Sequence, residues 1–543
     1  MKRLASILIS VILFFACIPL EESHAEAVSG KRDFVSYNLG FVCKIPLAMQ
    51  EKGSIEDVSA RLEGADGSRI YIYSQDIKGM SPQTYIYYSN KQIRAGRGGF
   101  TMLNERTTTL ANSAKAYEFL YQRDIIENIE NDKNIYFEIN AVYPQFNRVL
   151  TFWVKTDSAN LDYYTQMARD MASSAWLFEK GVKTQRAPYV QRDIDLKGKS
   201  TRLKIGKDSM MWGIMHPHNL DGADYTSNLA PFEKSIGKKF EFLMTYSDFN
   251  NKVNLKEVQE VYDDERVMML TWQPWVYIDK TQNENIESES DVLIPEIVKG
   301  KYDDYIRSWA RDIKSVGEPV FVRFANEMNG DWDPWCAWFF GKDTELYNEA
   351  WNRIERIFHE EGADNAQFVW NPHDRSYPDF DWNSPHMYYP GDEHVDWVGL
   401  TGYNNGTSFS GDVWREFGDI YQPVYDDYMK HYREKPFMIT EFSCNEDGGD
   451  KAAWIRNGFS SFANMPNIKA AVWFNQIDTR WLYNIDSSEA SLNAFKESLL
   501  QNPLFSLKNV YKEEALQTQD EENIQNESKQ QQEKTESQKT AKK

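Results

Sequence analysis

Two glutamates in this chain each follow a short apolar run. Glu327 follows the run 320–325 and precedes a Gly-Asp-Trp segment, and Glu441 ends the run 437–440. Two carboxyl groups that flank a bound sugar are the minimal machinery for cleaving a glycosidic bond, one acting as acid and base and the other as nucleophile. The pair predicts this chemistry if both runs are strands whose carboxyl ends meet at one face.

Eight short apolar runs in the second half of the chain could supply such strands. Amphipathic helices lie between several of them; one ends at Gly317, and another begins near Asp343 and ends at Gly362. The segment 208–508 therefore predicts an α/β fold, a (β/α)8 TIM barrel, in which Glu327 ends the fourth strand and Glu441 the seventh. An open doubly wound sheet is the alternative, but it requires a glycine-rich phosphate loop that the chain lacks. The runs are 211–215, 240–245, 267–271, 320–325, 368–370, 395–400, 437–440 and 470–474.

The remainder of the chain divides into four further segments. Residues 1–25 have a basic start, an apolar run and a small-residue cleavage site, which predict a secretory signal; a lipoprotein with lipidated Cys17 is the alternative. Residues 31–180 combine alternating strands with two helices and predict a small α+β domain with an accessory role in anchoring or binding. A polar linker is expected at 181–207 and a disordered polar tail at 511–543.

Composition restricts the partners. The formal net charge of -21 argues against nucleic acids and anionic membranes, and no apolar run, the one in residues 1–25 included, is long enough to span a bilayer. Aromatic residues make up 14% of the chain, which suits a neutral polysaccharide because sugar rings stack on aromatic planes. The oligomeric state stays open, as does pairing between Cys336 and Cys444, for which free buried thiols are the simpler expectation.

Four motifs resemble those of glycoside hydrolase family 26, in the clan of retaining (β/α)8 enzymes. The resemblance implies that Glu327 is the acid and base and Glu441 the nucleophile, that Tyr403 contacts the nucleophile, and that Trp473 forms the floor of the subsite for the attacked sugar. It also implies a secreted endo-β-glycanase that needs no cofactor. The motifs are Arg323-x-x-Asn326-Glu327-Met328-Asn329-Gly330-Asp331-Trp332, Thr440-Glu441-Phe442, the region from Tyr388 to Tyr403 and Val472-Trp473-Phe474.

Two positions depart from the family pattern. Asn326 stands where the family's mannanases commonly have histidine, and asparagine suits a hydrogen bond to the 2-hydroxyl at which mannose and glucose differ. The prevalence of mannanases in the family puts β-1,4-mannan first among the expected substrates, and Asn326 puts β-1,3-1,4-glucan second. Thr401 stands where the family often has aspartate. A non-catalytic carbohydrate-binding envelope protein is the alternative from another functional class.

Further residues are candidates for substrate contacts. Trp332 and Trp272 either line sugar subsites or pack loops, and His216 follows the first strand at the end where substrate binds. Arg323 is expected to be a buried support for the carboxylates. No set of histidines and cysteines has ligand spacing, so the sequence predicts no metal site.

Overall fold

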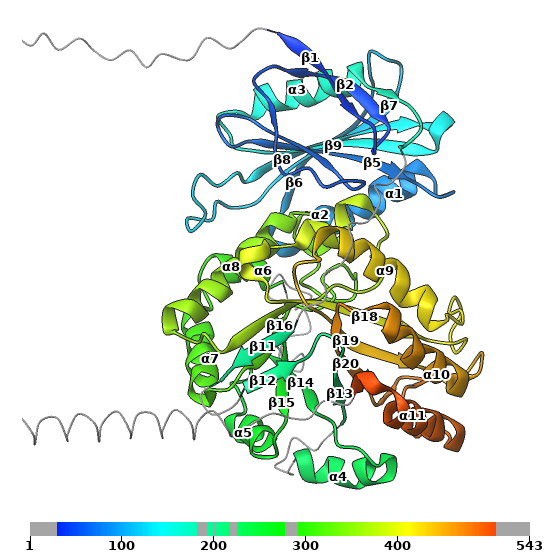
Figure 1. Ribbon diagram of the computed structural model, residues 1–543. Helices are drawn as coiled ribbons and strands as arrows, with labels where there is room; N and C mark the ends of the chain where they lie inside the picture. The colour runs from blue at the N-terminus through cyan, green and yellow to red at the C-terminus, as the bar shows by residue number, and fades with distance from the viewer. Residues whose placement is uncertain (1–29, 182–192, 199–201, 218–224, 277–291, 506–543) are drawn as a thin grey trace, which may run out of the picture.

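The computed structural model describes residues 30–181, 193–198, 202–217, 225–276 and 292–505. The expected signal at 1–25 with Cys17 and the expected tail at 511–543 lie outside these residues. The described chain forms an N-terminal unit built on an antiparallel sheet and a C-terminal barrel, stacked one on the other (Figure 1).

Eight parallel strands close the barrel in chain order. Each pairs in parallel with its neighbours, and the last strand pairs with the first through Met211 to Met215 and Ala470 to Phe474. All eight predicted apolar runs overlap these strands, which confirms the predicted barrel. The strands are β13 (Met211–Met215), β14 (Phe242–Asp248), β15 (Val267–Gln273), β16 (Val320–Phe324), β17 (Ala366–Trp370), β18 (Trp397–Asn404), β19 (Phe437–Cys444) and β20 (Ile468–Phe474).

Amphipathic helices cover the outside of the barrel. The helix α7 is terminated by Gly317 and the helix α8 by Gly362. Both glycines adopt the left-handed backbone conformation that is common after the last residue of a helix. Among the described residues, no helix combines the length and apolar character that a membrane span needs. The barrel helices are α4 (Tyr225–Ile236), α5 (Leu255–Asp263), α6 (Ile294–Val298), α7 (Asp303–Val316), α8 (Thr344–Glu361), α9 (Phe417–His431), α10 (Lys451–Ser461) and α11 (Glu489–Gln501).

A short hairpin lies within the stretch 181–207 that was expected to be a linker. Strands β11 (Ile194–Lys197) and β12 (Arg202–Ile205) pair in antiparallel fashion. Their apolar side chains Ile194, Leu203 and Ile205 are buried against the barrel interior, together with Phe321 of β16. This part of the stretch is therefore a packed element of the barrel.

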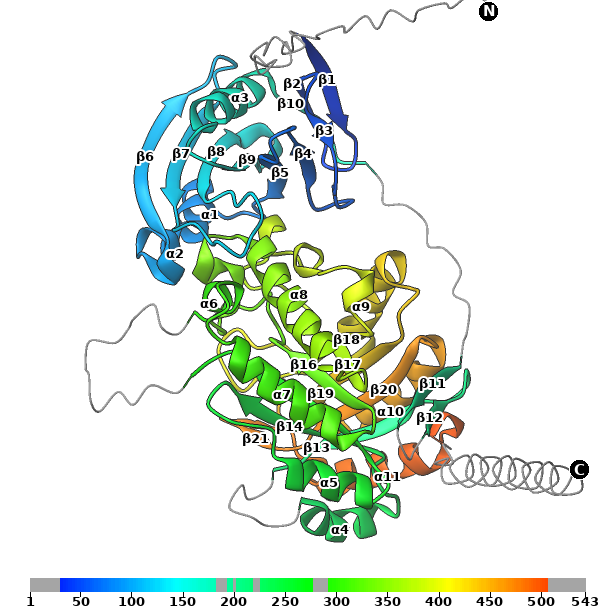
Figure 2. The same ribbon diagram turned by 90° about the vertical axis from the view of Figure 1, so that its left-hand side faces the viewer.

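The N-terminal unit contains a seven-stranded antiparallel sheet in the order β3-β4-β5-β9-β8-β7-β6 and a three-stranded sheet, β1-β2-β10. Its longest helix, α3 (Leu161–Ser174), packs on β2, β8 and β9 (Figure 2). The strands are β1 (Lys31–Ser36), β2 (Phe41–Pro46), β3 (Gln50–Glu51), β4 (Ala60–Glu63), β5 (Arg69–Asp76), β6 (Thr101–Thr109), β7 (Lys115–Gln122), β8 (Ile135–Tyr143), β9 (Arg148–Thr156) and β10 (Trp176–Leu177).

Both faces of this sheet are covered. Every residue of β8 and β9 is buried, as occurs when neither face of a strand meets water. One face packs under α3 and the three-stranded sheet. The other is aromatic and belongs to the same hydrophobic cluster as the outer layer of the barrel. Two short helices, α1 (Pro82–Ser89) and α2 (Lys91–Arg94), lie between the two units (Figures 1 and 2).

The three cysteines among the described residues are free and buried. The sulfur of Cys336 lies 3.6 Å from Asn383 Oδ1, whereas that of Cys444 lies 3.3 Å from Asn404 Nδ2. Cys336 and Cys444 therefore have separate surroundings, which answers the question of their pairing.

Candidate active site

The backbone leaves the β conformation directly after β16. Ala325 and Glu327 have φ values of 45° and 54°, in the left-handed region that non-glycine residues rarely adopt. The Glu327 amide donates to the carbonyl of Asn371 at 2.7 Å, which fixes this turn to the end of β17. Such conformations cost on the order of 1–3 kcal/mol each and concentrate at functional sites. The strained turn therefore identifies the segment around Glu327 as a candidate functional site.

The Glu441 carboxylate lies within β19 and receives three donors. Tyr246 from β14 donates to Oε1 at 2.6 Å, and Tyr403 from β18 donates to Oε2. Arg323 forms a salt bridge with Oε1. Burial and then the charge of Glu441 raise the pKa of both tyrosines well above the usual value, so their hydroxyls stay protonated and act as donors. Glu441 is thus fixed in position from three strands.

A network of buried polar side chains forms hydrogen bonds with Arg323. The Asn371 side-chain oxygen accepts from Arg323 Nε at 2.5 Å and from the hydroxyls of Thr401 and Thr440 at 3.0 and 2.9 Å. Arg323 also donates to the hydroxyls of Thr271 and Thr401, each at 3.2 Å. A fully buried guanidinium needs such partners, because an unpaired buried charge is strongly destabilising. Thr401, which departs from the family pattern, is therefore part of this network.

The two glutamates have different surroundings. Burial raises the pKa of Glu327, and the negative charge of Glu441 raises it further, whereas His373 and Arg323 oppose the shift. A raised pKa favours a protonated carboxyl that can donate a proton. Glu441, by contrast, accepts hydrogen bonds from two tyrosines and forms a salt bridge with Arg323. Different surroundings thus suit the pair to different roles.

A third carboxyl group belongs to the same site. Burial and then the charge of Glu327 raise the pKa of Asp333 well above its usual value, and Glu441 adds to the effect while Arg323 opposes it. Asp333 is half-buried in the segment after Glu327. A protonated Asp333 carboxyl would add a hydrogen-bond donor to the site without adding charge.

Trp332, in the segment after Glu327, contacts both Glu327 and His373. The Trp332 indole nitrogen donates to Glu327 Oε2 at 3.2 Å, and its ring meets His373 edge-on at 5.1 Å. Gly330 makes this possible, since a Cβ atom there would lie 2.4 Å from the indole ring. Trp332 is 46% exposed, so one part of it faces solvent beside the candidate acid.

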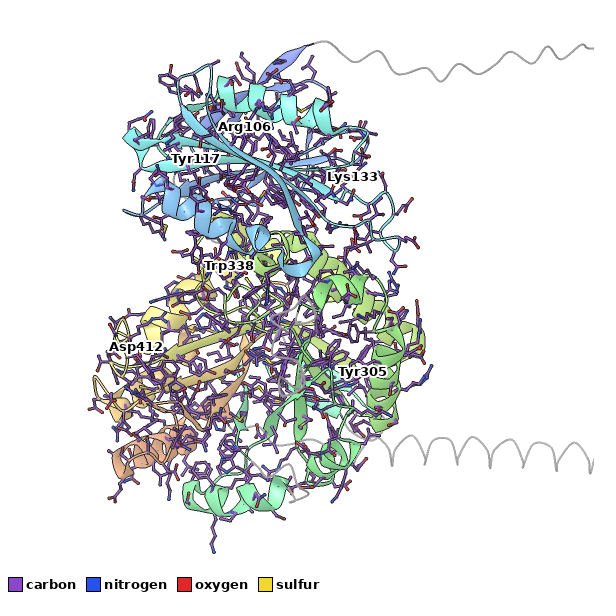
Figure 3. All side chains as sticks on the ribbon, turned by 180° about the vertical axis from the view of Figure 1, so that it is seen from behind. Arg106, Tyr117, Lys133, Tyr305, Trp338 and Asp412 are labelled. Atoms are coloured by element: carbon purple, nitrogen blue, oxygen red, sulfur yellow. The ribbon has the colours of Figure 1, made fainter. Side chains whose placement is uncertain are left out.

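The N-terminal unit contacts the same segment from outside. Tyr88, in the last turn of α1, donates its hydroxyl to Asp331 Oδ2 at 2.8 Å. Its ring stacks on Trp338 with centroids 4.8 Å apart, and the Trp338 indole donates to the Tyr88 carbonyl at 2.9 Å. Figure 3 labels Trp338 at this junction between the two units. The loop that carries Trp332 is therefore attached to both units.

Asn326 is buried just after β16, beside the end of β15. Its side-chain oxygen is 3.5 Å from Gln273 Nε2, and its carbonyl accepts from the Trp335 indole at 2.6 Å. The Gln273 contact is long, which leaves the Asn326 amide capable of bonding a substrate hydroxyl.

Two tryptophans predicted to contact substrate are buried in the fold. Trp473 is fully buried, donates its indole N–H to the Tyr483 carbonyl at 2.8 Å and packs against Phe442. Trp272 is also fully buried and stacks on Trp309 with centroids 4.3 Å apart. Neither has a ring face available for a sugar, so the predictions of subsite contacts for Trp473 and Trp272 are corrected. Both side chains point into the layer between strands and helices.

Other predicted residues lie where a substrate could reach them. His216 is half-buried at the end of β13, with Nδ1 2.9 Å from Asn475 Nδ2 and its ring stacked on Phe232. Tyr403 is half-buried beside Glu441. His218, also noted near the first strand, falls outside the described residues. The structure thus brings together Glu327, Glu441, Asn326, Tyr403 and Trp332, with His216 on the first strand.

Sequence reasoning missed several residues of the site. Tyr246 and Asn371 follow the general rule that polar residues at the carboxyl ends of barrel strands meet at the active face. Their immediate neighbours in the sequence form no motif that would identify them as site residues. A signal for Tyr246 was available in the sequence. The apolar part of β14 is followed by three further residues of the same strand, Tyr246-Ser247-Asp248, which lie at its carboxyl end. Asp333 carries no such signal, since it lies in a loop rich in polar and aromatic residues.

Comparisons with known proteins find that part of this chain is similar to glycoside hydrolases. Residues 269–431 match a family model described as glycosyl hydrolase family 26. Endoglucanase H of Acetivibrio thermocellus is 30% identical over 280 residues, which are 50% of this chain and 29% of that protein. Mannan endo-1,4-beta-mannosidase of Bacillus subtilis is 34% identical over 177 residues, 30% of this chain and 43% of that protein. The chain thus spans less than half the length of these relatives.

Among solved structures, the catalytic domain of a GH26 endo-beta-1,4-mannanase from Bacillus sp. JAMB-750 aligns with a TM-score of 0.42 and 17% identity. The alignment covers 56% of this chain and 90% of that one. This likeness is too distant to bear on the chemistry of the site.

Proposed function

We propose that the protein is an endo-acting β-glycanase that cleaves polysaccharide chains with retention of anomeric configuration. The match of residues 269–431 to the model of glycosyl hydrolase family 26 supports this proposal. Glu327 is the acid and base, and Glu441 is the nucleophile. No cofactor is needed for this reaction, since two carboxyl groups perform every proton transfer and bond exchange.

In the first step Glu441 attacks the anomeric carbon while Glu327 protonates the departing glycosidic oxygen. The bond from carbon to the leaving oxygen breaks as the bond to Glu441 forms, which gives a covalent glycosyl-enzyme and a free chain end. Tyr246, Tyr403 and Arg323 hold the Glu441 carboxylate in one orientation. An oriented nucleophile removes the entropic cost of finding the attack geometry.

In the second step Glu327, now ionised, takes a proton from a water molecule that attacks the same carbon. The bond to Glu441 breaks, its carboxylate is regenerated, and Glu327 again holds a proton. The raised pKa of Glu327 suits both steps, because it favours the protonated form at the start of each cycle.

The observation that supports this proposal most directly is the contrast between the two glutamates. Glu441 accepts bonds from two tyrosines and an arginine, whereas Glu327 is half-buried beside a tryptophan and has a raised pKa. The buried Arg323 forms its salt bridge with Glu441, and its charge also opposes the raised pKa of Glu327.

The roles can be separated with Glu327→Ala and Glu441→Ala. Glu327→Ala should lose roughly 10²–10⁴-fold of kcat on polysaccharide yet retain attack on aryl glycosides with good leaving groups, which need no acid. Added azide should restore its turnover and give a β-glycosyl azide. Glu441→Ala should lose turnover on both substrates by roughly 10⁴-fold or more.

Proton NMR of the first product tests the stereochemistry. The β-anomer should appear first and then mutarotate. An α-anomer as the first product would overturn the retaining mechanism. Equal turnover by wild type and Glu441→Ala would overturn the role of Glu441. Binding without turnover on every β-glycan would favour a carbohydrate-binding protein instead.

We propose β-1,4-mannan as the first substrate to test and β-1,3-1,4-glucan as the second. The match to a relative named for mannan supports the first. Asn326 and the longer match to a relative named endoglucanase support the second. A reducing-sugar assay on mannan, mixed-linkage glucan and xylan distinguishes the candidates, and activity on glucan alone would exclude mannan.

A further inference from the structure

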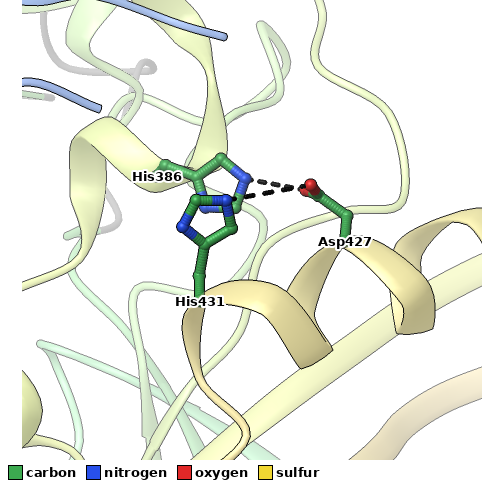
Figure 4. Close-up of side chains that lie close together, drawn as sticks. All are labelled: His386, Asp427 and His431. Carbon is green, nitrogen blue, oxygen red and sulfur yellow. Dashed lines mark hydrogen bonds and ion pairs between the residues drawn. The ribbon is translucent and has the colours of Figure 1, made fainter. Parts of the chain in front are cut away.

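Three side chains with metal-binding atoms converge on the outside of the barrel, away from the two glutamates. His386 comes from the short helix η6 (Pro385–Tyr388), and Asp427 and His431 come from α9. Their ligand atoms all lie within 4.8 Å of one another. Figure 4 shows the two imidazoles and the carboxylate turned toward one another. We propose that these residues form a structural binding site for a divalent transition-metal ion of the zinc type.

The spacing on α9 is suited to such a site. Asp427 and His431 are four residues apart, so both project from one face of the helix. Asp427 Oδ2 lies 2.7 Å from His386 Nε2, and Asp427 Oδ1 lies 4.0 Å from His431 Nε2. Ligand atoms around a tetrahedral zinc with bonds of about 2.0–2.2 Å lie about 3.3–3.6 Å apart. The observed distances bracket this range, so small side-chain rotations would complete the geometry.

A simple hydrogen-bonded pair of His386 and Asp427 does not explain why a second imidazole, that of His431, lies beside them. One bond between His386 and Asp427 satisfies both groups, yet the ring of His431 lies against that of His386 with centroids 4.3 Å apart. Two imidazoles beside one carboxylate form an N2O ligand set, which suits zinc and similar ions. Magnesium and calcium prefer oxygen ligands alone.

The surroundings resemble those of known metal ligands. His386 Nδ1 lies 2.6 Å from the hydroxyl of Tyr432, so Nε2, the nitrogen that faces Asp427, is the one that would bind an ion. Metal-binding histidines usually have such a partner, which fixes the tautomer and the ring. The side chain of His386 is 6% exposed, whereas those of Asp427 and His431 are 36% and 24% exposed. An ion could therefore enter from the side of α9.

Such an ion would join two successive connections of the barrel. The helix η6 belongs to the segment between β17 and β18, and α9 follows β18. The site includes neither glutamate, so its role would be to hold these connections together and not to take part in hydrolysis.

Calorimetric titration of the untagged, chelator-treated full chain with zinc chloride tests the proposal. Wild type should bind one ion at this site, and its thermal midpoint should rise by at least about 3 °C. His431→Ala and Asp427→Asn should each weaken binding at least tenfold and remove the rise. Magnesium chloride should have no such effect. Both variants alter half-exposed residues, so they should fold.

His359→Ala is the matched control. His359 also lies near a carboxylate, with Nδ1 3.5 Å from Asp364 Oδ1, but its side chain is 79% exposed, and no third ligand joins this pair among the residues that the structure describes. This variant should bind zinc like wild type. A wild type that binds zinc no more tightly than His431→Ala, or a midpoint rise that survives in that variant, would overturn the site. Visible absorption of the cobalt-loaded chain gives an independent readout of tetrahedral ligands, and its loss in His431→Ala is expected.

Discussion

The raised pKa of Glu327 has a cost for the folded protein. Burial and the charge of Glu441 disfavour the ionised form, so ionising Glu327 is harder in the folded state than in the unfolded chain. The folded protein therefore loses stability as the pH rises from the ordinary pKa of 4.5 through the higher folded value. Glutamine mimics the protonated carboxyl and avoids this loss.

We expect Glu327→Gln to melt at the same temperature as wild type near pH 4 and at a higher temperature near pH 8, while its hydrolytic activity falls by roughly 10²–10⁴-fold. Thermal melts across this pH range measure the difference. Glu360→Gln, which alters a carboxylate on the surface of α8, is the control and should show no pH-dependent gain. A constant difference between Glu327→Gln and wild type at all pH values would contradict the raised pKa of Glu327.

Arg323 acts on catalysis through Glu441, so we regard it as a positioning residue. Lysine would keep the charge but lose the planar fork that reaches Glu441, Asn371 and the threonine hydroxyls together. Arg323→Lys should lower kcat by about 10²–10³-fold with little change in KM, because substrate contacts stay in place. Steady-state kinetics separates the two constants.

The control for this variant is Arg311→Lys, which alters an exposed ion pair with Glu361 on the outer helices. It should leave both kinetic constants unchanged, because exposed pairs contribute little. If Arg323→Lys lowers stability yet leaves kcat intact, Arg323 is structural only.

The loop between β16 and α8 connects the catalytic barrel to helix α1 of the N-terminal unit. Tyr88 donates to Asp331, the residue before Trp332, which in turn donates to Glu327. Tyr88→Phe removes one hydrogen bond worth about 0.5–1.5 kcal/mol but keeps the ring stack on Trp338. We expect kcat to fall by about 2-fold to 10-fold as Trp332 loses its fixed position.

Tyr87→Phe is the neighbouring control, because Tyr87 turns toward the sheet and meets Tyr117 edge-on. Its kinetics should equal those of wild type. Equal kcat values for Tyr88→Phe and Tyr87→Phe would show that the N-terminal unit does not act on the site.

The barrel elements could be predicted from sequence because their signals are local. Each apolar run was short, and glycines such as Gly317 and Gly362 marked helix ends by a backbone conformation that other residues avoid. The two glutamates could be found for the same reason, since each directly follows an apolar run. These features depend only on neighbouring residues.

The errors concern contacts between distant residues. The residues near Trp473 do not show that its side chain points toward Phe442 and not toward substrate. Side chains alternate between the two faces of a strand, but this strand is apolar on both faces, so the sequence does not tell one face from the other. The partners of Glu441 come from three other strands, and His386 lies 41 residues before Asp427. Only the closed barrel and its connections bring such residues together.

At the scale of the molecule, the N-terminal sheet depends on the barrel for burial. Ion pairs also cross the junction: Lys342 pairs with Glu138, and Lys155 lies 2.7 Å from Asp343. All four side chains are 3% exposed or less. Burial lowers the pKa of Lys342 although Glu138 opposes the shift, as expected for a charge removed from water. Because separating the units would expose the aromatic face and leave these charges unpaired, we expect them to unfold together.

Two adjacent glycines provide a test of this junction. Gly98 and Gly99 both have left-handed φ values, 63° and 78°, so alanine strains the backbone at either position. A Cβ atom on Gly98 would lie 2.6 Å from the Phe339 carbonyl and 3.0 Å from Phe340 Cα in the loop before α8, whereas one on Gly99 meets nothing within 4 Å. Only Gly98→Ala forces the two units apart.

We expect Gly99→Ala to lower stability by about 1 kcal/mol and to keep full activity. Gly98→Ala should lose more stability and also reduce kcat, because the loop it displaces continues into Asp331 and Trp332. Calorimetry should show one transition for wild type and for Gly99→Ala, and a transition for Gly98→Ala that is lower or split in two. Equal stability and kcat in the two variants would mean that the junction tolerates separation, and the N-terminal unit would then be an independent appendage of the barrel.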